Sequence, residues 1–365
     1  MVSHHPGRVD SAVCLAYYLS VLESLTQQLK QSIALSSEQV AGAVSALVDE
    51  HVSVQSKADF LTALARKGET TEEIASFAGE LRDKSIRPPF TGESVDVCGT
   101  GGDHLKTFNI STTVAFIVAA AGIPVAKHGN RAITSQAGSA DVLEALGIRI
   151  DFAPEQSAQS LREHQFAFFF APKYHPAFKH IAAARKLCAE RGQRTIFNFL
   201  GPLLNPARPT AQLVGVPQPR LCEPIARVLQ TLGVRRGMVV SGCVEGDCFL
   251  DELSTLGETT IAEFYQDRGF ATSTFKQPEI SGRLSDLAGG DSAANAEIIR
   301  RILRAEDRGP KRDAVLLNAG AALLVAGRAK SIAQGAELAA ELIDSGAAMK
   351  KVETLKKYGA TAGIS

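Results

Sequence analysis

The stretch from Val95 to Gly147 constrains the fold of this chain more than any other. In order, it reads as a short buried strand, a glycine loop, an apolar helix, a second strand, and a Gly/Ser loop that opens another helix. A crossover of this kind joins parallel strands. Glycines let backbone N–H groups approach a ligand closely, and a helix N-terminus presents unpaired donors with partial positive charge. We therefore expect a parallel sheet whose loops bind a ligand with more than one phosphate.

Pro88 and Pro89 separate two parts of the chain that differ in their pattern of apolar residues. Before them, apolar residues recur at three- and four-residue spacing, which predicts helices and no convincing strand. The Thr70–Glu73 segment is typical of a capping box at the start of the last of these helices. The predicted helices are Leu15–Leu29, Glu38–Glu50, Ser56–Arg66 and Thr71–Ile86.

After Pro89, strand-like and helix-like runs alternate, which predicts a largely parallel α/β sheet. The predicted strands are Ser94–Cys98, Pro124–Ala126, Ala167–Ala171, Leu213–Val216 and Gly237–Ser241, with a further pair at Thr259–Tyr265 and Ala271–Phe275. The predicted helices between and after them are Ser111–Ala121, Ser139–Leu146, Glu223–Leu232, Ala293–Arg304, Ala314–Ala326, Ser331–Ser345 and Met349–Tyr358. The expected fold class is α/β, with a small all-helical N-terminal domain, a large domain built on a mostly parallel central sheet, and C-terminal helices.

Composition narrows the class of protein. The 365 residues carry 39 basic and 39 acidic side chains, a balance that argues against general binding to nucleic acid. The six cysteines are scattered and form no CxxC pair, which favours reduced thiols over a disulfide framework or a zinc site. The first ten residues lack the apolar region of a signal peptide, and no run approaches ~20 apolar residues, so we expect a cytoplasmic protein without a membrane span.

The glycine loop Gly99–Asp103 matches neither common nucleotide motif. No Gly-Lys-Ser/Thr follows it, as a P-loop requires, and its register does not fit the dinucleotide fingerprint. A tight strand-to-helix turn is the simplest interpretation. Asn109–Thr112, however, places two hydroxyls at the start of an apolar helix, where phosphate oxygens or a hydrated metal could bind. Ser111 and Thr112 could equally be N-caps, and the two roles are compatible.

The Lys127–Arg131 segment, at the expected end of a strand, lies where parallel sheets bind ligands. Lysine offers a point charge to a phosphate, and Asn130 can both donate and accept hydrogen bonds. His128 taken alone would more often be structural. Four polar residues around Gly129 together predict a binding site.

These loops resemble the anthranilate phosphoribosyltransferase family. The resemblance rests on Gly99–Asp103, Asn109–Thr112 and Lys127–Arg131, followed by Gly138–Asp141, Arg194–Asn198, Leu200–Pro206, Leu250–Ser254 and Leu317–Ala322. It covers nearly the whole chain from about residue 20. It implies a helical domain, residues 1–90, joined in space by helices around 172–192, and a substrate-binding α/β domain, residues 91–365.

The resemblance implies a reaction in which the amino group of anthranilate attacks C1 of phosphoribosyl pyrophosphate (PRPP) and releases pyrophosphate. PRPP would be bound by Gly99, Gly102, Asp103, Thr107, Asn109, Ile110, Ser111, Thr112, Lys127, His128, Gly129, Asn130, Arg131, Ser135 and Ser139. Gly99 and Asn130 would also border anthranilate. An aromatic amine is already a free base at neutral pH, so catalysis would rest on positioning and leaving-group stabilisation, with Lys127, His128 and Asn130 contributing.

The resemblance also implies Mg²⁺ as cofactor, ligated directly or through water by Ser111, Asp251 and Glu252. Hydroxyl and carboxylate oxygens are hard ligands suited to Mg²⁺ that bridges phosphates. Without the family pattern, Asp251-Glu252 would be interpreted as a solvated turn.

The resemblance also implies an arginine that binds the anthranilate carboxylate, on a helix shortly before Arg194–Asn198. In this chain, no arginine stands at its usual position. Counting back from Arg194, the usual position holds Cys188, and we interpret the difference as an insertion of about one helical turn after Arg185. The role therefore passes to Arg185, with Arg191 as the competing candidate. The resemblance further implies a homodimer formed through the N-terminal helical domain.

Two other functions compete with this one. Pyrimidine nucleoside phosphorylases share the fold and a similar lysine loop, but would not be expected to carry Gly99–Asp103 with Asn109–Thr112. A catalytically silent relative that binds nucleic acid would show degraded loops and a basic surface, whereas here the loops are intact and the charge is balanced.

Overall fold

The computed structural model describes residues 11–132, 136–266, 269–276 and 282–362. It divides into two compact units, one of residues up to Ser85 with His175–Asn198, the other of Ile86–Tyr174 with residues from Phe199 onward. Within the described ranges, no helix has the length and apolarity that a membrane span requires.

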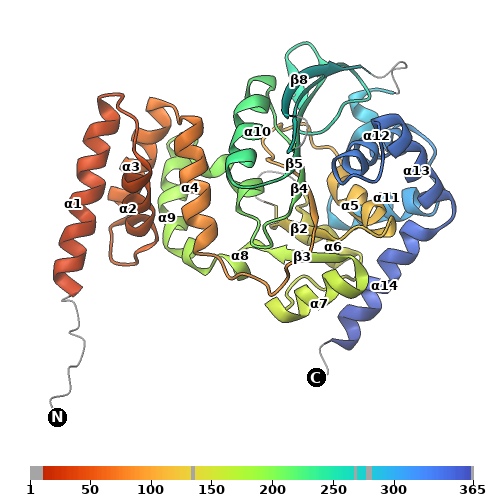
Figure 1. Cartoon of the computed structure of the whole chain (residues 1–365), viewed down its shortest axis with the longest axis horizontal. Helices are drawn as coiled ribbons and strands as arrows, with labels where there is room; N and C mark the ends of the chain where they lie inside the picture. The colour runs from red at the N-terminus through yellow and green to blue at the C-terminus, as the bar shows by residue number, and fades with distance from the viewer. Residues whose placement is uncertain (1–10, 133–135, 267–268, 277–281, 363–365) are drawn as a thin grey trace. The chain divides into compact units, whose positions relative to one another are not determined.

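The first unit is all-helical (Figure 1). Its helices are α1 (Ser11–Lys30), α2 (Ser37–Val48), α3 (Val54–Lys67), α4 (Thr71–Asp83) and α9 (Lys179–Glu190). The predicted capping box is confirmed, because the Thr70 hydroxyl accepts from Glu73 N and Glu73 Oε2 accepts from Thr70 N. The fully buried Glu73 carboxylate also accepts from Lys67 Nζ at 2.6 Å and from Leu35 N at 2.9 Å. One satisfied buried carboxylate thus joins the starts of two helices to the end of a third.

The second unit is built on one eight-stranded sheet within the described residues. The strands are β1 (Val95–Gly99), β2 (Val125–Gly129), β3 (Phe166–Phe170), β4 (Ala211–Gly215), β5 (Arg236–Glu245), β6 (Cys248–Leu250), β7 (Thr259–Tyr265) and β8 (Gly269–Phe275). Their order is β3-β2-β1-β4-β5-β7-β8, with β6 also pairing with β5. The pairs among β1 to β5 are parallel, and β6, β7 and β8 join antiparallel.

The sheet contains a topological switch point between β1 and β4. From β1 the chain adds β2 and β3 on one side, and then returns to add β4 and β5 on the other. Crossovers that run in opposite directions from two neighbouring strands leave a crevice at the strands' carboxyl ends. In the register of this pair, Gly99 lies opposite Gly215 at that end.

Helices cover both faces of the sheet, with α10 on one side and α5 and α12 on the other (Figure 1). Helix α5 (Ile110–Ala120) is apolar all round because it is enclosed by the sheet, α12, α13 and α14. Phe116 of α5 stacks on Phe166 of β3 with ring centroids 5.3 Å apart. The remaining helices are α6 (Ser139–Ala145), α7 (Pro154–His164), α8 (Ala171–Tyr174), α10 (Cys222–Thr231), α11 (Ser292–Leu303), α12 (Pro310–Val325), α13 (Ile332–Asp344) and α14 (Ala347–Thr361).

The predicted fold class is confirmed, two predicted element boundaries are wrong, and helix α7 and strand β6 were not predicted. Strand β2 continues to Gly129, so Lys127 and His128 lie within it, whereas the prediction ended it at Ala126. Helix α4 ends at Asp83, short of Ile86 and the prolines. Helix α7 was missed because small residues such as Ser157 and Ser160 form much of its buried face, which leaves no clear apolar periodicity.

Candidate active site

The predicted substrate residues of the α/β unit gather at the carboxyl ends of its central strands. Gly99 ends β1 and Gly129 ends β2. Gly102, with φ of 87°, lies in the loop after β1, while Thr107 forms an isolated bridge with Ala288. The loops that follow β1 and β2 thus begin at the same end of the sheet, the carboxyl ends of its strands, where parallel α/β sheets bind ligands.

The Asp251-Glu252 pair fills the crevice at the switch point. An added Cβ on Gly99 would lie 2.0 Å from Asp251 Oδ2, and one on Gly215 would lie 1.5 Å from the Asp251 carbonyl oxygen. Asp251 Oδ2 also accepts a 2.7 Å hydrogen bond from Gly101 N. Glu252 is 8% exposed. The pair is therefore not a solvated turn, and only glycine at these two strand ends admits it.

Lys127 is a buried lysine facing the same place. Its ammonium is 2.7 Å from the Val97 carbonyl oxygen and 3.4 Å from Ser111 Oγ. Burial lowers the pKa of Lys127, and the nearby Asp96 and Glu252 carboxylates oppose that shift. This side chain brings a positive charge to the first turn of α5.

If all of them were ionised, the surrounding carboxyl groups would carry more negative charge than Lys127 could offset. Burial raises the pKa of Asp96 to about 6, although Lys127 and Asn205 oppose it. The pKa of Asp251 rises to about 8 because the group is buried and lies beside Asp103. Burial and Asp251 raise the pKa of Glu252 well above its usual range, while Lys127 opposes them. A nearby cation would favour the ionised forms of these carboxyl groups, so the cluster has the chemistry of a cation site.

These residues fit Mg²⁺ bound together with a phosphate ligand. Within the described residues, no three His, Cys, Asp or Glu side chains are grouped so as to hold a metal by themselves. Mg²⁺ is usually bound by one or two carboxylates, several waters and substrate phosphates, so a ready-made cage is not required. Asp251, Glu252 and the neighbouring Ser111 carry hard oxygen atoms that could ligate the metal in such a site.

The N-terminus of α5 presents its first turn to this cluster. Asn109 is the N-cap, so the alternative in which Ser111 and Thr112 are the caps is wrong, because both lie within the first helical turn. The Ser111 backbone N–H lowers the pKa of Glu252 by hydrogen bonding to it. Thr112 is 1% exposed, and its hydroxyl has no hydrogen-bond partner among the described atoms. Unpaired donors here favour anion binding.

Asp141 of α6 organises the second loop. Its Oδ2 accepts from Ala132 N and Gly138 N, both at 2.9 Å. These N–H groups and Arg131 lower the pKa of Asp141 in spite of its partial burial. The Arg131 guanidinium pairs with Asp141 and Glu144, so in this arrangement it is directed at α6.

The remaining predicted residues of this loop are placed as follows. The Asn130 carbonyl oxygen accepts from Ala140 N at 3.2 Å, and Ser139 begins α6. His128 Nδ1 lies 3.1 Å from the Gly201 carbonyl oxygen. Ser135 lies outside the described residues.

Arg185 and Arg191 differ sharply in their surroundings within the helical unit. The Arg185 guanidinium lies over the Phe197 ring, 5.1 Å from its centroid, and burial lowers its pKa. Arg191 is engaged instead by Asp59 at 3.6 Å and by Gln55 at 3.1 Å. A desolvated guanidinium stacked on an aromatic ring has donors left for a carboxylate.

Two buried asparagines support the site and were not predicted to do so. Asn318 Oδ1 accepts from Leu253 N at 2.9 Å, and its Nδ2 donates to the Leu253 carbonyl oxygen at 3.0 Å. Asn205 Nδ2 donates to Asp96 at 2.8 Å and to the Ala126 carbonyl oxygen at 2.7 Å. Both asparagines belong to segments that carry the family resemblance, and this membership is the sequence feature that could have indicated their role.

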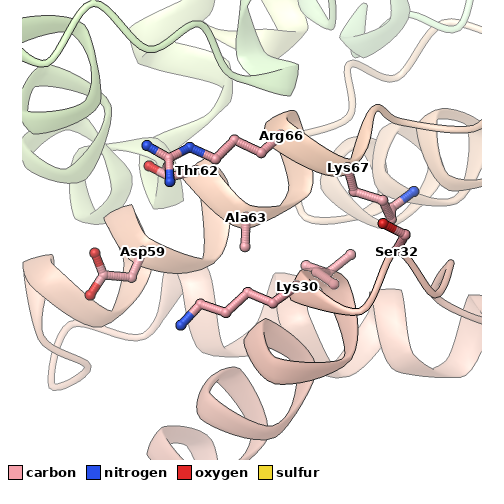
Figure 2. A pocket seen from close by; sticks show the side chains of 8 residues that line it. Lys30, Ser32, Asp59, Thr62, Ala63, Arg66 and Lys67 are labelled. Atoms are coloured by element: carbon pink, nitrogen blue, oxygen red, sulfur yellow. The ribbon is translucent and has the colours of Figure 1, made fainter.

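A separate pocket of about 450 Å³ opens in the helical unit (Figure 2). Its polar lining includes Lys30, Asp59, Arg66 and Lys67. Lys67 is already paired with the buried Glu73 carboxylate. The pocket contains none of the predicted substrate residues, so we assign it no part in the site.

Comparisons with known proteins first define the class. Residues 91–349 match the model of the glycosyl transferase family a/b domain, and residues 23–85 match that of the family's helical bundle domain. The predicted enzyme class, a glycosyltransferase, is thereby confirmed.

Individual relatives show which family of glycosyltransferases the chain belongs to. The chain is 48% identical over 328 residues to anthranilate phosphoribosyltransferase of Lacticaseibacillus paracasei, covering 89% of this chain and 93% of that protein. The crystal structure of the Thermus thermophilus enzyme is 38% identical with a TM-score of 0.83, covering 92% and 99% of the two chains. The Saccharomyces cerevisiae enzyme, in complex with PRPP and Mg, is 25% identical with a TM-score of 0.83, covering 94% and 98%. The chain belongs to the anthranilate phosphoribosyltransferase family, as its motifs predict.

Proposed function

We propose that this chain transfers the phosphoribosyl group of PRPP to anthranilate, giving N-(5-phosphoribosyl)anthranilate and pyrophosphate, a step of tryptophan biosynthesis. The observation that carries the proposal is the placement of Asp251 and Glu252 in the switch-point crevice, beside Lys127 and the first turn of α5. The names of the relatives support the same reaction.

The chemistry required of these residues is mainly electrostatic. The amine nitrogen forms a bond to C1 as the bond from C1 to the pyrophosphate oxygen breaks, and the proton that the amine loses passes to water. Lys127 lies 3.4 Å from Ser111 in the first turn of α5, so its ammonium and the first-turn N–H groups would stabilise the negative charge that develops on the leaving group. Positioning and charge stabilisation account for the rate without a strong base.

The metal site is proposed at Ser111, Asp251 and Glu252. When bound there, Mg²⁺ neutralises phosphate charge and orients the pyrophosphate. The yeast relative in complex with PRPP and Mg supports this cofactor. Two of the charged side chains at this site are largely removed from solvent, since Glu252 is 8% exposed and Lys127 is 1% exposed.

Arg185 is proposed to bind the anthranilate carboxylate, with Gly99 and Asn130 bordering the acceptor. Arg185 is supported over Arg191 because its guanidinium is desolvated and lies over Phe197, whereas Arg191 already pairs with Asp59. A homodimer formed through the helical domain, and a cytoplasmic location, remain predictions.

The direct test mixes the protein, Mg²⁺, PRPP and anthranilate, and follows the loss of anthranilate fluorescence. Loss that requires both PRPP and Mg²⁺ supports the proposal. A folded protein that shows no loss, or that instead phosphorolyses thymidine or uridine, refutes it.

A matched pair of variants tests the acceptor clamp. Arg185→Ala removes a charge-assisted hydrogen bond worth about 1.5–3 kcal/mol, so the KM for anthranilate should rise about 10- to 100-fold. Arg191→Ala, a change of the same size on the same segment, should leave that KM within about twofold, because its partners are protein groups. The reverse pattern would assign the clamp to Arg191.

A further inference from the structure

The two substrate loops of the α/β unit are joined by a relay of two asparagine side chains. Gly290 N donates to Asn295 Oδ1 at 2.8 Å, and Asn295 Nδ2 donates to Asn109 Oδ1 at 2.9 Å. Asn109 Nδ2 then donates to the Ala137 carbonyl oxygen at 3.3 Å. This asparagine relay therefore runs from a backbone donor in front of α11, through the cap of α5, to the loop in front of α6.

The direction of every hydrogen bond in the relay is fixed by its two ends. A backbone N–H can only donate and a backbone carbonyl can only accept. Because Gly290 supplies an N–H, the amide oxygen of Asn295 must face it, and the Asn295 amide nitrogen must face Asn109. The Asn109 amide nitrogen is then left to face Ala137. Neither amide can flip without opposing two donors or two acceptors.

The surroundings of Asn295 restrict it to this arrangement. Asn295 is 2% exposed, and a Cβ added to Gly289 would lie 2.8 Å from its Oδ1. The segment in front of α11 is itself attached to the loop after β1, since Gly289 N donates to the Lys106 carbonyl oxygen at 2.9 Å. Helix α11 also reaches the far end of α6, where Arg300 donates to the Ala145 carbonyl oxygen at 2.8 Å.

We propose that Asn295 is a positioning residue for PRPP, which sets the Asn109 amide and, through it, the distance between the β1–α5 loop and the loop in front of α6. This inference rests on the proposed function. Asn295 does not belong to either predicted substrate loop, and it acts through Asn109. Loss of the relay should therefore affect PRPP, which both loops are proposed to bind, more than anthranilate.

The main test compares Asn295→Ala and Asn295→Asp with the wild-type protein. Asn295→Asp keeps the acceptor for Gly290 but replaces the donor to Asn109 by an oxygen, so the relay is broken with little change of volume. A displacement of about 1 Å at a reacting centre can cost about 100-fold in rate. We expect kcat/KM for PRPP to fall about 10- to 100-fold in both variants, with the KM for anthranilate within about twofold.

Ser160→Ala serves as the matched control. Ser160 is 1% exposed and donates to the Phe166 carbonyl oxygen at 2.6 Å, so its loss also removes a buried hydrogen bond, but at α7, outside the loops. This variant should keep kcat/KM for PRPP within about twofold. An equal loss in Ser160→Ala and Asn295→Ala would refute a specific role for Asn295.

A double-mutant cycle tests whether Asn295 acts through Asn109. If it does, Asn109→Ala combined with Asn295→Ala should lose no more kcat/KM for PRPP than Asn109→Ala alone. Multiplicative losses would overturn the proposal.

A readout without turnover separates this proposal from the proposed function. Hydrogen exchange at Gly138 and the following amides of α6 should be faster in Asn295→Asp than in the wild-type protein, and unchanged in Ser160→Ala. If exchange is faster in Asn295→Asp but the wild-type protein has no transferase activity, the relay is supported and the proposed function is rejected. Unchanged exchange together with normal PRPP kinetics would reject the relay.

Discussion

The substitution Gly215→Ala tests whether the two strand ends must lack side chains to admit the carboxylates proposed to bind Mg²⁺. An alanine Cβ at this position would lie 1.5 Å from the Asp251 carbonyl oxygen and 2.2 Å from its carbonyl carbon. Non-bonded contacts require about 3.5 Å, so the Asp251 backbone must retreat by roughly 2 Å. Overpacking of this kind costs about 1–3 kcal/mol of stability.

The expected effect on catalysis follows from that displacement. Because a misplacement of about 1 Å can cost about 100-fold in rate, kcat should fall at least about 100-fold. The Mg²⁺ concentration for half-maximal rate should rise as well, since Glu252 moves with Asp251. The assay follows anthranilate fluorescence at saturating PRPP while Mg²⁺ is varied.

Gly42→Ala is the control for this experiment. Gly42 lies inside α2, and its added Cβ would meet only Val21 at 3.7 Å, an ordinary contact. This variant should be as active as the wild-type protein and about 0.5–1 kcal/mol more stable. A folded Gly215→Ala protein with kcat close to that of wild type and an unchanged Mg²⁺ titration would refute the reasoning.

Three further predictions follow from the same region. Asp251→Asn combined with Glu252→Gln should chiefly lower kcat and weaken the dependence of the initial rate on Mg²⁺, because an amide cannot ionise to provide the carboxylate ligand that Mg²⁺ prefers. In the native state, Asp96 has its pKa raised from 3.8 to about 6, so it binds more protons than in the unfolded chain. Stability should therefore fall by about 2 kcal/mol as pH rises from about 4 to about 7, and Asp96→Asn should lack this loss in urea unfolding. Asn318→Ala leaves the Leu253 N–H and carbonyl without their side-chain partner, which should cost about 2–6 kcal/mol of unfolding free energy and raise the Mg²⁺ concentration needed for half-maximal rate.

Each of these three has an outcome that contradicts it. An unchanged Mg²⁺ titration in the double variant would move the metal site away from Asp251 and Glu252. A stability difference between Asp96→Asn and wild type that does not change with pH would mean that ionisation of Asp96 does not oppose folding. Full stability of Asn318→Ala would mean that Leu253 finds other partners.

The parts of the fold and site that follow from local sequence were predictable. Periodicity and the Thr70 capping box located the N-terminal helices, and the glycine and hydroxyl loops located both halves of the proposed PRPP site. Lys127 was expected after its strand because the predicted strand ended at Ala126. It lies inside β2 because its backbone pairs in register with Phe168 of β3, and its buried ammonium meets the Val97 carbonyl oxygen.

The supporting residues could not be found from local patterns. Asn295 is 186 residues from Asn109, and its helix has an ordinary amphipathic sequence, so only the packing of α11 reveals its partner. Gly215 ends an apolar strand, a common place for glycine, so nothing in the local sequence distinguishes it. Its role depends on the sheet order that places Asp251 over it. Side-chain contacts between elements far apart in sequence produce no periodic pattern, so a single sequence does not reveal them.

The switch point between β1 and β4 also has a consequence for how the protein folds. These neighbouring strands are far apart in sequence, as the contact of Ser94 with Thr210 across 116 positions illustrates. Closing so long a segment costs chain entropy before the parallel pairing offsets it, which makes this a slow step. A nascent chain can form the β1–α5–β2 unit early, but it cannot complete the crevice until β4 docks. Binding of PRPP with Mg²⁺ should therefore appear only in the last phase of refolding.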